Sequence, residues 1–123
     1  MIPKDFEKAK YVNLYTFKRD GSVVKTTVLV GKDGDRLLVH TGANSGKVKR
    51  IRNNPNVFIE PSNLLGKSKG EKHKGTARIL KGNEREVALQ KVKRCCIEKL
   101  LSYIFHDVVL GKKSAIIEII VVA

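Results

Sequence analysis

The sequence predicts a mainly β domain with a minor α-helical part, built on an antiparallel sheet. Its 123 residues fit a single domain spanning residues 1–123. Residues 11–17 alternate side chains as a half-buried strand does, and residues 22–30 and 36–41 are rich in β-branched and apolar residues. The turns Asp20-Gly21 and Asp33-Gly34 separate these segments, and Asp-Gly turns of this kind close hairpins. Three consecutive antiparallel strands form a meander, which favours an all-β or α+β sheet.

The middle of the chain predicts a short helix, two more strands and a long polar loop. Val48 and Ile51 stand at helical spacing within residues 47–54, and Pro55 ends that helix. Residues 56–60 and 75–80 have the composition of strands. The stretch 62–74 is rich in Gly, Ser and Lys and is too polar to be core, so we expect a mobile basic loop there.

The last third of the chain predicts a helical segment followed by a buried strand. Asn83 and Glu86 resemble a capping box, and apolar residues then recur at helical period toward about Phe105. The apolar residues are Leu89, Val92, Cys96, Leu100 and Ile104. Residues 114–122 are almost continuously apolar, which is typical of a strand that is central in its sheet or buried in a dimer.

The formal net charge of +13 indicates an attraction to polyanions, namely nucleic acid, an acidic membrane face or an acidic cofactor. The basic residues are spread through the whole chain, aromatic residues make up 6%, and Trp is absent. No RNA-binding aromatic motif or helix-turn-helix signature accompanies the charge. A basic nucleic-acid-binding β domain therefore remains an alternative that we do not favour.

Other features of the sequence bear on location and redox chemistry. No apolar run approaches the roughly 20 residues of a membrane helix, and the first ten residues contain no signal-peptide core. We therefore expect a cytoplasmic protein without a membrane partner. Cys95 and Cys96 are adjacent with no second pair, so a zinc spacing is absent and ordinary thiols are expected, with a redox role as the minor alternative.

The segment from His40 to Lys47 is the candidate site. A strand ends there, a Gly-containing loop follows, and a helix begins, so unpaired backbone N–H groups and the helix dipole favour an anion. Thr41 and Ser45 add hydroxyl donors, Lys47 adds a charge, and Arg50 lies one turn further along the same helix face. Alternatively, Ser45 simply caps a basic surface helix. Neither a Walker run nor a Rossmann glycine pattern is present, which disfavours nucleotide triphosphates and dinucleotides.

Several motifs in order resemble the pyridoxamine 5'-phosphate oxidase-like split-barrel family. They are the Phe17–Gly21 turn, the stretch Thr41–Pro55 with Asn53-Asn54-Pro55 at its end, and Gly75-Thr76-Ala77-Arg78. The resemblance spans about Tyr11 to Val121 and is strongest to the small F420- or FMN-dependent oxidoreductases. It implies an antiparallel split β-barrel with Greek-key character, of the FMN-binding type.

The resemblance also implies which residues hold the cofactor. Thr41, Ser45 and Lys47 match the positions that bind its phosphate. Arg50 matches a basic position near the phosphate in the deazaflavin-using relatives. Gly46 stands where the flavin oxidases often have Arg, and the substrate-binding His and Arg of true pyridoxamine phosphate oxidation have no match.

Further positions follow from the same resemblance. The second strand would lie along the isoalloxazine-type ring, which implies contacts from Lys25, Thr26, Thr27 and Val28, with Lys25 where the flavin oxidases use Arg for the phosphate. His40 is a further contact candidate because it precedes Thr41 at a strand end. His73 and His106 are expected to be surface residues, and we assign no catalytic side chain and no metal ligand.

The expected function is binding of F420 or FMN and two-electron redox of a small organic substrate. F420 is favoured over FMN by Gly46, by Arg50 and by lysines on the basic loop that suit a polyglutamate tail. We expect a homodimer that completes the cofactor site, because one helix does not cover both apolar faces of the last strand. A cofactor-binding protein without turnover, for storage or sensing, is the first alternative.

Overall fold

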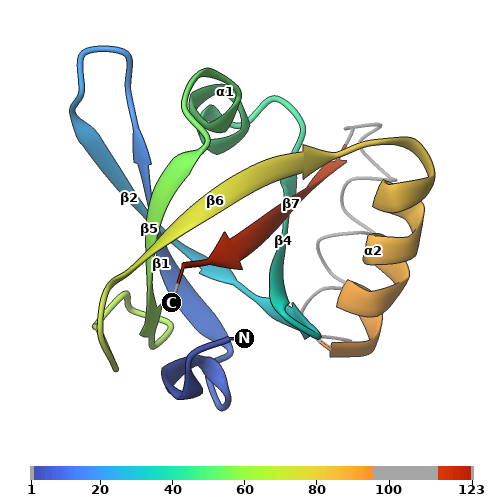
Figure 1. Ribbon diagram of the computed structural model, residues 1–123, viewed down its shortest axis with the longest axis horizontal. Coiled ribbons are helices and arrows are strands. Elements are labelled where there is room, and N and C mark those ends of the chain that lie inside the picture. Colours follow the sequence, from blue (N-terminus) through green and yellow to red (C-terminus); the bar gives the residue numbers. More distant parts are fainter. Residues whose placement is uncertain (1, 96–113, 123) are drawn as a thin grey trace.

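The computed structural model describes residues 2–95 and 114–122 of the chain. Seven strands form one antiparallel sheet that curls into a half-barrel, with α1 across one end and α2 against one side (Figure 1). The strands are β1 (Tyr11–Phe17), β2 (Val23–Leu29), β3 (Gly31–Asp33), β4 (Arg36–Gly42), β5 (Asn56–Ser62), β6 (His73–Leu80) and β7 (Ser114–Val121). The helices are the 3-10 turn η1 (Lys4–Phe6), α1 (Gly46–Asn53) and α2 (Gly82–Cys95).

The order of strands in the sheet is β2-β1-β5-β6-β7-β4-β3. The final strand lies between β6 and β4, so the prediction of a central last strand is confirmed. The predicted meander is wrong beyond its first hairpin: β1 pairs with β2, but β4 pairs with β7 and β3. The alternation of polar and apolar residues identifies a strand but not the strand it pairs with. After β2 the chain continues into β3 and β4, which lie at the other end of the strand order.

Two other predictions about local structure need correction. Residues 31–33, expected to be part of a turn, form the short strand β3 against β4. The expected capping box is displaced, because α2 already begins at Gly82 and Asn83 lies inside its first turn. Gly82 has a φ of +58°, which glycine adopts without steric cost, and this lets the chain turn sharply from β6 into α2. The predicted helical residues beyond Cys95 lie outside the described residues.

The interior of the half-barrel is an apolar core with a smaller core beside it. Leu14, Leu37, Ile59 and Ile117 are fully buried inside the barrel. The second cluster fills the space between the sheet and α2, and consists of Leu38, Leu80, Ala88 and Ile116. Because β7 contributes Ile117 to one core and Ile116 to the other, its two faces are both covered over this stretch.

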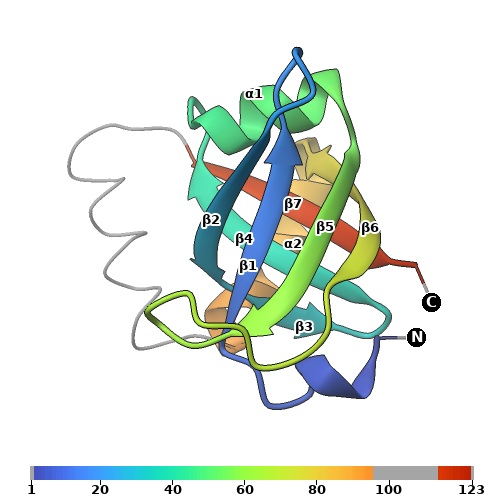
Figure 2. The ribbon, with the colours of Figure 1, turned by 90° about the vertical axis from the view of Figure 1, so that its left-hand side faces the viewer.

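The β5–β6 connection, residues 63–72, folds back against the outer face of β1, β2 and β5, at the opposite end of the barrel from α1 (Figure 2). The Asn63 Oδ1 atom accepts hydrogen bonds from the backbone N–H groups of Leu65 and Lys67. The Lys69 N–H donates to the Pro61 carbonyl. No helix in the described part of the chain has both the length and the apolar character needed to cross a membrane.

Candidate functional site

The N-terminus of α1 follows directly from the end of β4. Ser45 is the N-cap, and its Oγ accepts a hydrogen bond from the Val48 N–H at 3.4 Å. Thr41, the second-last residue of β4, has its Oγ1 3.4 Å from the Ser45 Oγ. Val48 and Ile51 are buried and hold the helix against the barrel end. The first-turn N–H groups therefore stand beside two hydroxyl groups, which is an arrangement suited to an anion.

Two cationic side chains lie close together beside this helix start. The Arg50 Nε donates a 2.6 Å hydrogen bond to the Oγ1 of Thr16, a fully buried residue at the end of β1. Burial lowers the pKa of Lys47, and the nearby charge of Arg50 lowers the same pKa further. Within the described ranges, no carboxylate pairs with Lys47 or Arg50. The site therefore carries two positive charges that a bound anion would neutralise.

Gly46 leaves the space that the Arg50 guanidinium uses. A Cβ atom built on Gly46 would lie 2.6 Å from the Arg50 Nη1, closer than atoms in contact allow. The family resemblance implies that an Arg at position 46 is missing here. The guanidinium of Arg50 lies over that position, so an arginine group is present although it comes from one helical turn later.

The four predicted residues of β2 divide between the two faces of the sheet. Lys25 and Thr27 lie on the outer face, and the Thr27 Oγ1 donates to the Asn13 Oδ1 at 2.8 Å. Thr26 and Val28 lie on the inner face, where Val28 packs against the barrel core. A Cβ atom built on Gly66 would lie 2.8 Å from the Thr27 Oγ1, so the β5–β6 connection covers Thr27. Lys25 is the exposed residue among these four.

His40 stands apart from the other predicted residues of the α1 site. It pairs in register with Ile116, on the face of β4 that carries Leu38 and is covered by α2. Thr41 is on the opposite face because side chains alternate along a strand. The structure thus brings together Thr41, Ser45, Gly46, Lys47 and Arg50, and separates His40 from them.

A buried polar network on the outer face was not found from the sequence. The Asn13 Nδ2 donates to the Glu60 Oε1 at 2.9 Å and to the Gly66 carbonyl at 2.9 Å. The Tyr15 hydroxyl donates to the same Glu60 oxygen at 2.5 Å, and the Lys72 Nζ lies 4.1 Å from the centre of the Tyr15 ring. Asn13 and Glu60 are both buried, although they face away from the barrel interior.

The network fixes the protonation states of its members. Burial acts to raise the pKa of Glu60, but hydrogen bonds from Tyr15 and Asn13 outweigh it and hold that pKa below its usual value. Burial, together with the hydrogen bond to Glu60, raises the pKa of Tyr15 to about 12. At neutral pH the network therefore contains a carboxylate and a neutral phenol.

The residues of two resemblance motifs meet at the same end of the barrel as α1. Phe17, Lys18 and Arg19 of the β1–β2 turn, with Asn53 and Asn54, line an open pocket of about 370 Å³. The Arg19 Nη2 lies 3.5 Å from the Asn53 Oδ1 across it. Segments that are 34 residues apart in sequence thus form one polar surface.

The fold defined by these strands and by α1 is the split barrel of the pyridoxamine 5'-phosphate oxidase-like proteins. One solved structure with this fold is described as a "putative pyridoxamine 5'-phosphate oxidase" from Listeria innocua. The likeness has a TM-score of 0.67 at 16% identity and covers 96% of this chain and 88% of that one.

Two other solved structures share the fold with different described roles. An F420-H2-dependent reductase matches with a TM-score of 0.65 at 15% identity, covering 89% of this chain and 93% of its own. HutZ, the heme storage protein of Vibrio cholerae, matches with a TM-score of 0.65 at 11% identity, and the match covers 95% of this chain and 84% of HutZ. No family model matches the sequence, and no curated protein matches it either.

Proposed function

We propose that the protein binds a phosphorylated flavin-type cofactor, F420 or FMN, with the phosphate at the N-terminus of α1. The observation that carries this proposal is the pair Lys47 and Arg50, two neighbouring cations without a carboxylate partner in the described residues, beside the Ser45 cap. Leaving two partly buried charges unpaired costs free energy, and a phosphate would remove that cost.

The donors at this site match the needs of a phosphate group. A phosphate has several acceptor oxygens, and the hydroxyls of Thr41 and Ser45, the first-turn N–H groups and the two cations are all donors. The hydrogen bond from Arg50 to Thr16 holds the guanidinium in place before any anion arrives. When bound, the cofactor supplies two-electron chemistry for a small organic substrate, and the chain supplies binding and orientation.

The choice between the cofactors favours F420. Its polyglutamate tail adds negative charges that a chain of net charge +13 attracts. Lys25 of β2 and Lys72, whose Nζ lies over the Tyr15 ring of β1, are on the outer face of the sheet and contribute to this attraction. An F420-H2-dependent reductase among the proteins of the same fold adds support.

Binding without turnover is the second candidate. It is favoured by HutZ, a protein of the same fold that is described as a heme storage protein. Oxidation of the reduced cofactor by small electron acceptors, measured in the purified protein, separates an enzyme from a carrier.

Titration with both cofactors tests the phosphate site. Lys47→Ala should raise the dissociation constant roughly ten- to a hundredfold, since a charge-assisted hydrogen bond contributes about 1.5–3 kcal/mol. Lys49→Ala is the matched control, because it removes the same charge from an exposed position of the same helix. If the two variants bind FMN and F420 equally well, the phosphate lies elsewhere.

A further inference from the structure

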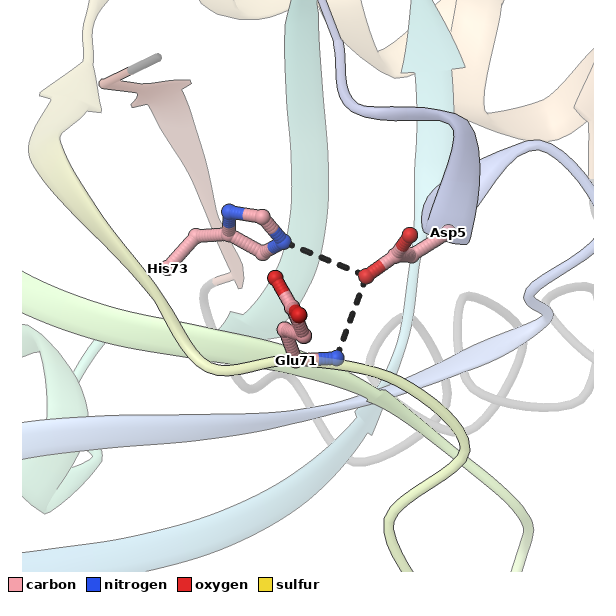
Figure 3. A group of neighbouring side chains, drawn as sticks. All are labelled: Asp5, Glu71 and His73. Atoms are coloured by element: carbon pink, nitrogen blue, oxygen red, sulfur yellow. Dashed lines mark hydrogen bonds and ion pairs between the residues drawn. The ribbon is translucent and has the colours of Figure 1, made fainter.

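Three potential metal ligands meet at the end of the barrel opposite α1. Asp5 belongs to η1, whereas Glu71 and His73 belong to the end of the β5–β6 connection and the start of β6. One ligand atom of each lies within 4.8 Å of the others (Figure 3). The sequence alone placed His73 on the surface of a loop, but it is the first residue of β6 and is half-buried.

Local structure explains why these three side chains converge. Glu71 lies two residues before His73, at the end of the β5–β6 connection, and Figure 3 shows both side chains beside Asp5. Phe6, the neighbour of Asp5, is fully buried in the barrel core and anchors η1. The Phe6 and His73 rings are in contact, with centroids 5.5 Å apart, and this contact fixes the imidazole.

The donor atoms of the three side chains lie close together. The His73 Nε2 lies 3.3 Å from the Asp5 Oδ2, and the Glu71 N–H donates to the same Asp5 oxygen at 3.1 Å. Figure 3 shows the Glu71 carboxylate beside the Nε2 side of the imidazole and facing Asp5. Ligand atoms bound about 2.0–2.2 Å from one ion lie at most about 4.4 Å apart, so small side-chain rotations are enough to bind one.

The two carboxylates of the cluster form no ion pair with Lys or Arg in the described part of the chain. The chain has 25 Lys and Arg residues against 12 Asp and Glu residues, so a carboxylate has many potential partners. Among the residues that the structure describes, His73 is the one basic group that pairs with Asp5.

We propose that Asp5, Glu71 and His73 form a site for a divalent transition metal ion of the zinc type, with water completing the coordination. One imidazole nitrogen and two carboxylate oxygens suit zinc, whereas Mg²⁺ and Ca²⁺ prefer oxygen ligands alone. The ion joins the N-terminal segment to the start of β6. The site is separate from α1 and does not depend on the proposed cofactor.

Calorimetric titration with Zn²⁺ tests the site, using protein without a histidine tag and with Cys95→Ser and Cys96→Ser, because thiolates bind zinc. We expect one ion per chain and a melting temperature that rises with Zn²⁺ concentration, since the ion binds the folded state. Glu71→Gln and His73→Gln should each weaken binding at least tenfold, as even loss of an outer-sphere partner costs about 10- to 100-fold.

Glu7→Gln is the matched control, because it makes the same change at an exposed glutamate outside the cluster. Its affinity should equal that of the parent protein, and Mg²⁺ should neither bind nor shift the melting temperature. If the serine variant misfolds, the wild-type protein titrated with Mn²⁺, which prefers oxygen and nitrogen donors to thiolates, gives the same comparison. Equal binding by the Glu71, His73 and Glu7 variants, or no saturable binding, would overturn the proposal.

Discussion

Glu60 is a carboxylate that stays ionised while buried on the outer face of β5. It does so because Tyr15 and Asn13 both donate to its Oε1 atom. Asn13 in turn accepts from Thr27 and donates to Gly66, so the network joins three strands to the connection that covers them. Each member is satisfied only while the others remain in place, which makes the network sensitive to single substitutions.

Removal of the Tyr15 hydroxyl should destabilise the protein in a pH-dependent way. At neutral pH, Tyr15→Phe should lower the free energy of unfolding by about 1.5–3 kcal/mol, the usual contribution of a hydrogen bond to a charged group. The folded pKa of Tyr15 is raised to about 12. Its stabilisation is therefore complete below the unfolded pKa of about 10 and is lost as the pH rises through the folded value.

The pH dependence of stability at low pH follows from the pKa of Glu60. Its folded pKa is depressed, so its contribution is complete above the unfolded pKa of about 4.3 and is lost as the pH falls through the folded value. Denaturant unfolding gives the free energy of unfolding of the wild-type protein and of Tyr15→Phe at each pH. The difference between these two free energies should be largest at pH values between the unfolded pKa of Glu60 and that of Tyr15, and it should become smaller below and above this range. A difference that stays constant with pH would mean that Tyr15 and Glu60 do not interact as described.

The sequence revealed the site residues that are close together along the chain, but not those that are far apart in it. Thr41, Ser45, Lys47 and Arg50 lie within ten residues of each other, so their closeness in the sequence and the helical spacing of Lys47 and Arg50 place them together. Asn13 and Glu60 are 47 residues apart and meet only through the register of β1 with β5. Thr16, which accepts the hydrogen bond from Arg50, is easier to single out from the sequence. It is a polar residue in the inward-facing series that begins with Val12 and Leu14.

Among the elements, β4 supports the candidate site most directly. It ends at the loop that leads into α1, and both of its faces are buried: Leu37 and Val39 in the barrel, Leu38 under α2. The sequence predicted the limits of β4 well because its apolar residues are continuous. Its pairing with β7, a strand that begins more than 70 residues later, has no local signature.

Truncation of a buried side chain in β4 should cost more than the same change on an edge strand. Val39 is fully buried, whereas Val23 on β2 is 50% exposed. Val39→Ala should lower the free energy of unfolding by about 1.5–3 kcal/mol, and Val23→Ala by less than about 1 kcal/mol. Urea denaturation of both variants checks this, and equal losses would contradict the assignment of β4 to the core.

The whole molecule leaves apolar side chains uncovered. Ile120 on the outer face of β7 is 43% exposed, Val122 directly after β7 is 54% exposed, and Leu65 on the β5–β6 connection is 91% exposed. In the described part of the chain, α2 packs against the same face of β7 at Ile116. The homodimer expected from the sequence would bury such groups, and a two-fold dimer would do so equally in both subunits.

Light scattering at micromolar concentration should therefore give twice the chain mass of 13.7 kDa. Ile120→Lys should shift the mass toward one chain while the circular dichroism spectrum is unchanged, because the residue is exposed within a single subunit. A single-chain mass for the wild-type protein would show that no partner covers this face.

The position of β7 also has a consequence for biosynthesis. A ribosome completes β4 and β6 before β7, yet those two strands have no contact with each other in the sheet except through it. Until residues 114–121 emerge, both strands present open edges, and open edges pair readily with other chains. The nascent chain is therefore most open to pairing with other chains in the interval before residues 114–121 are synthesised.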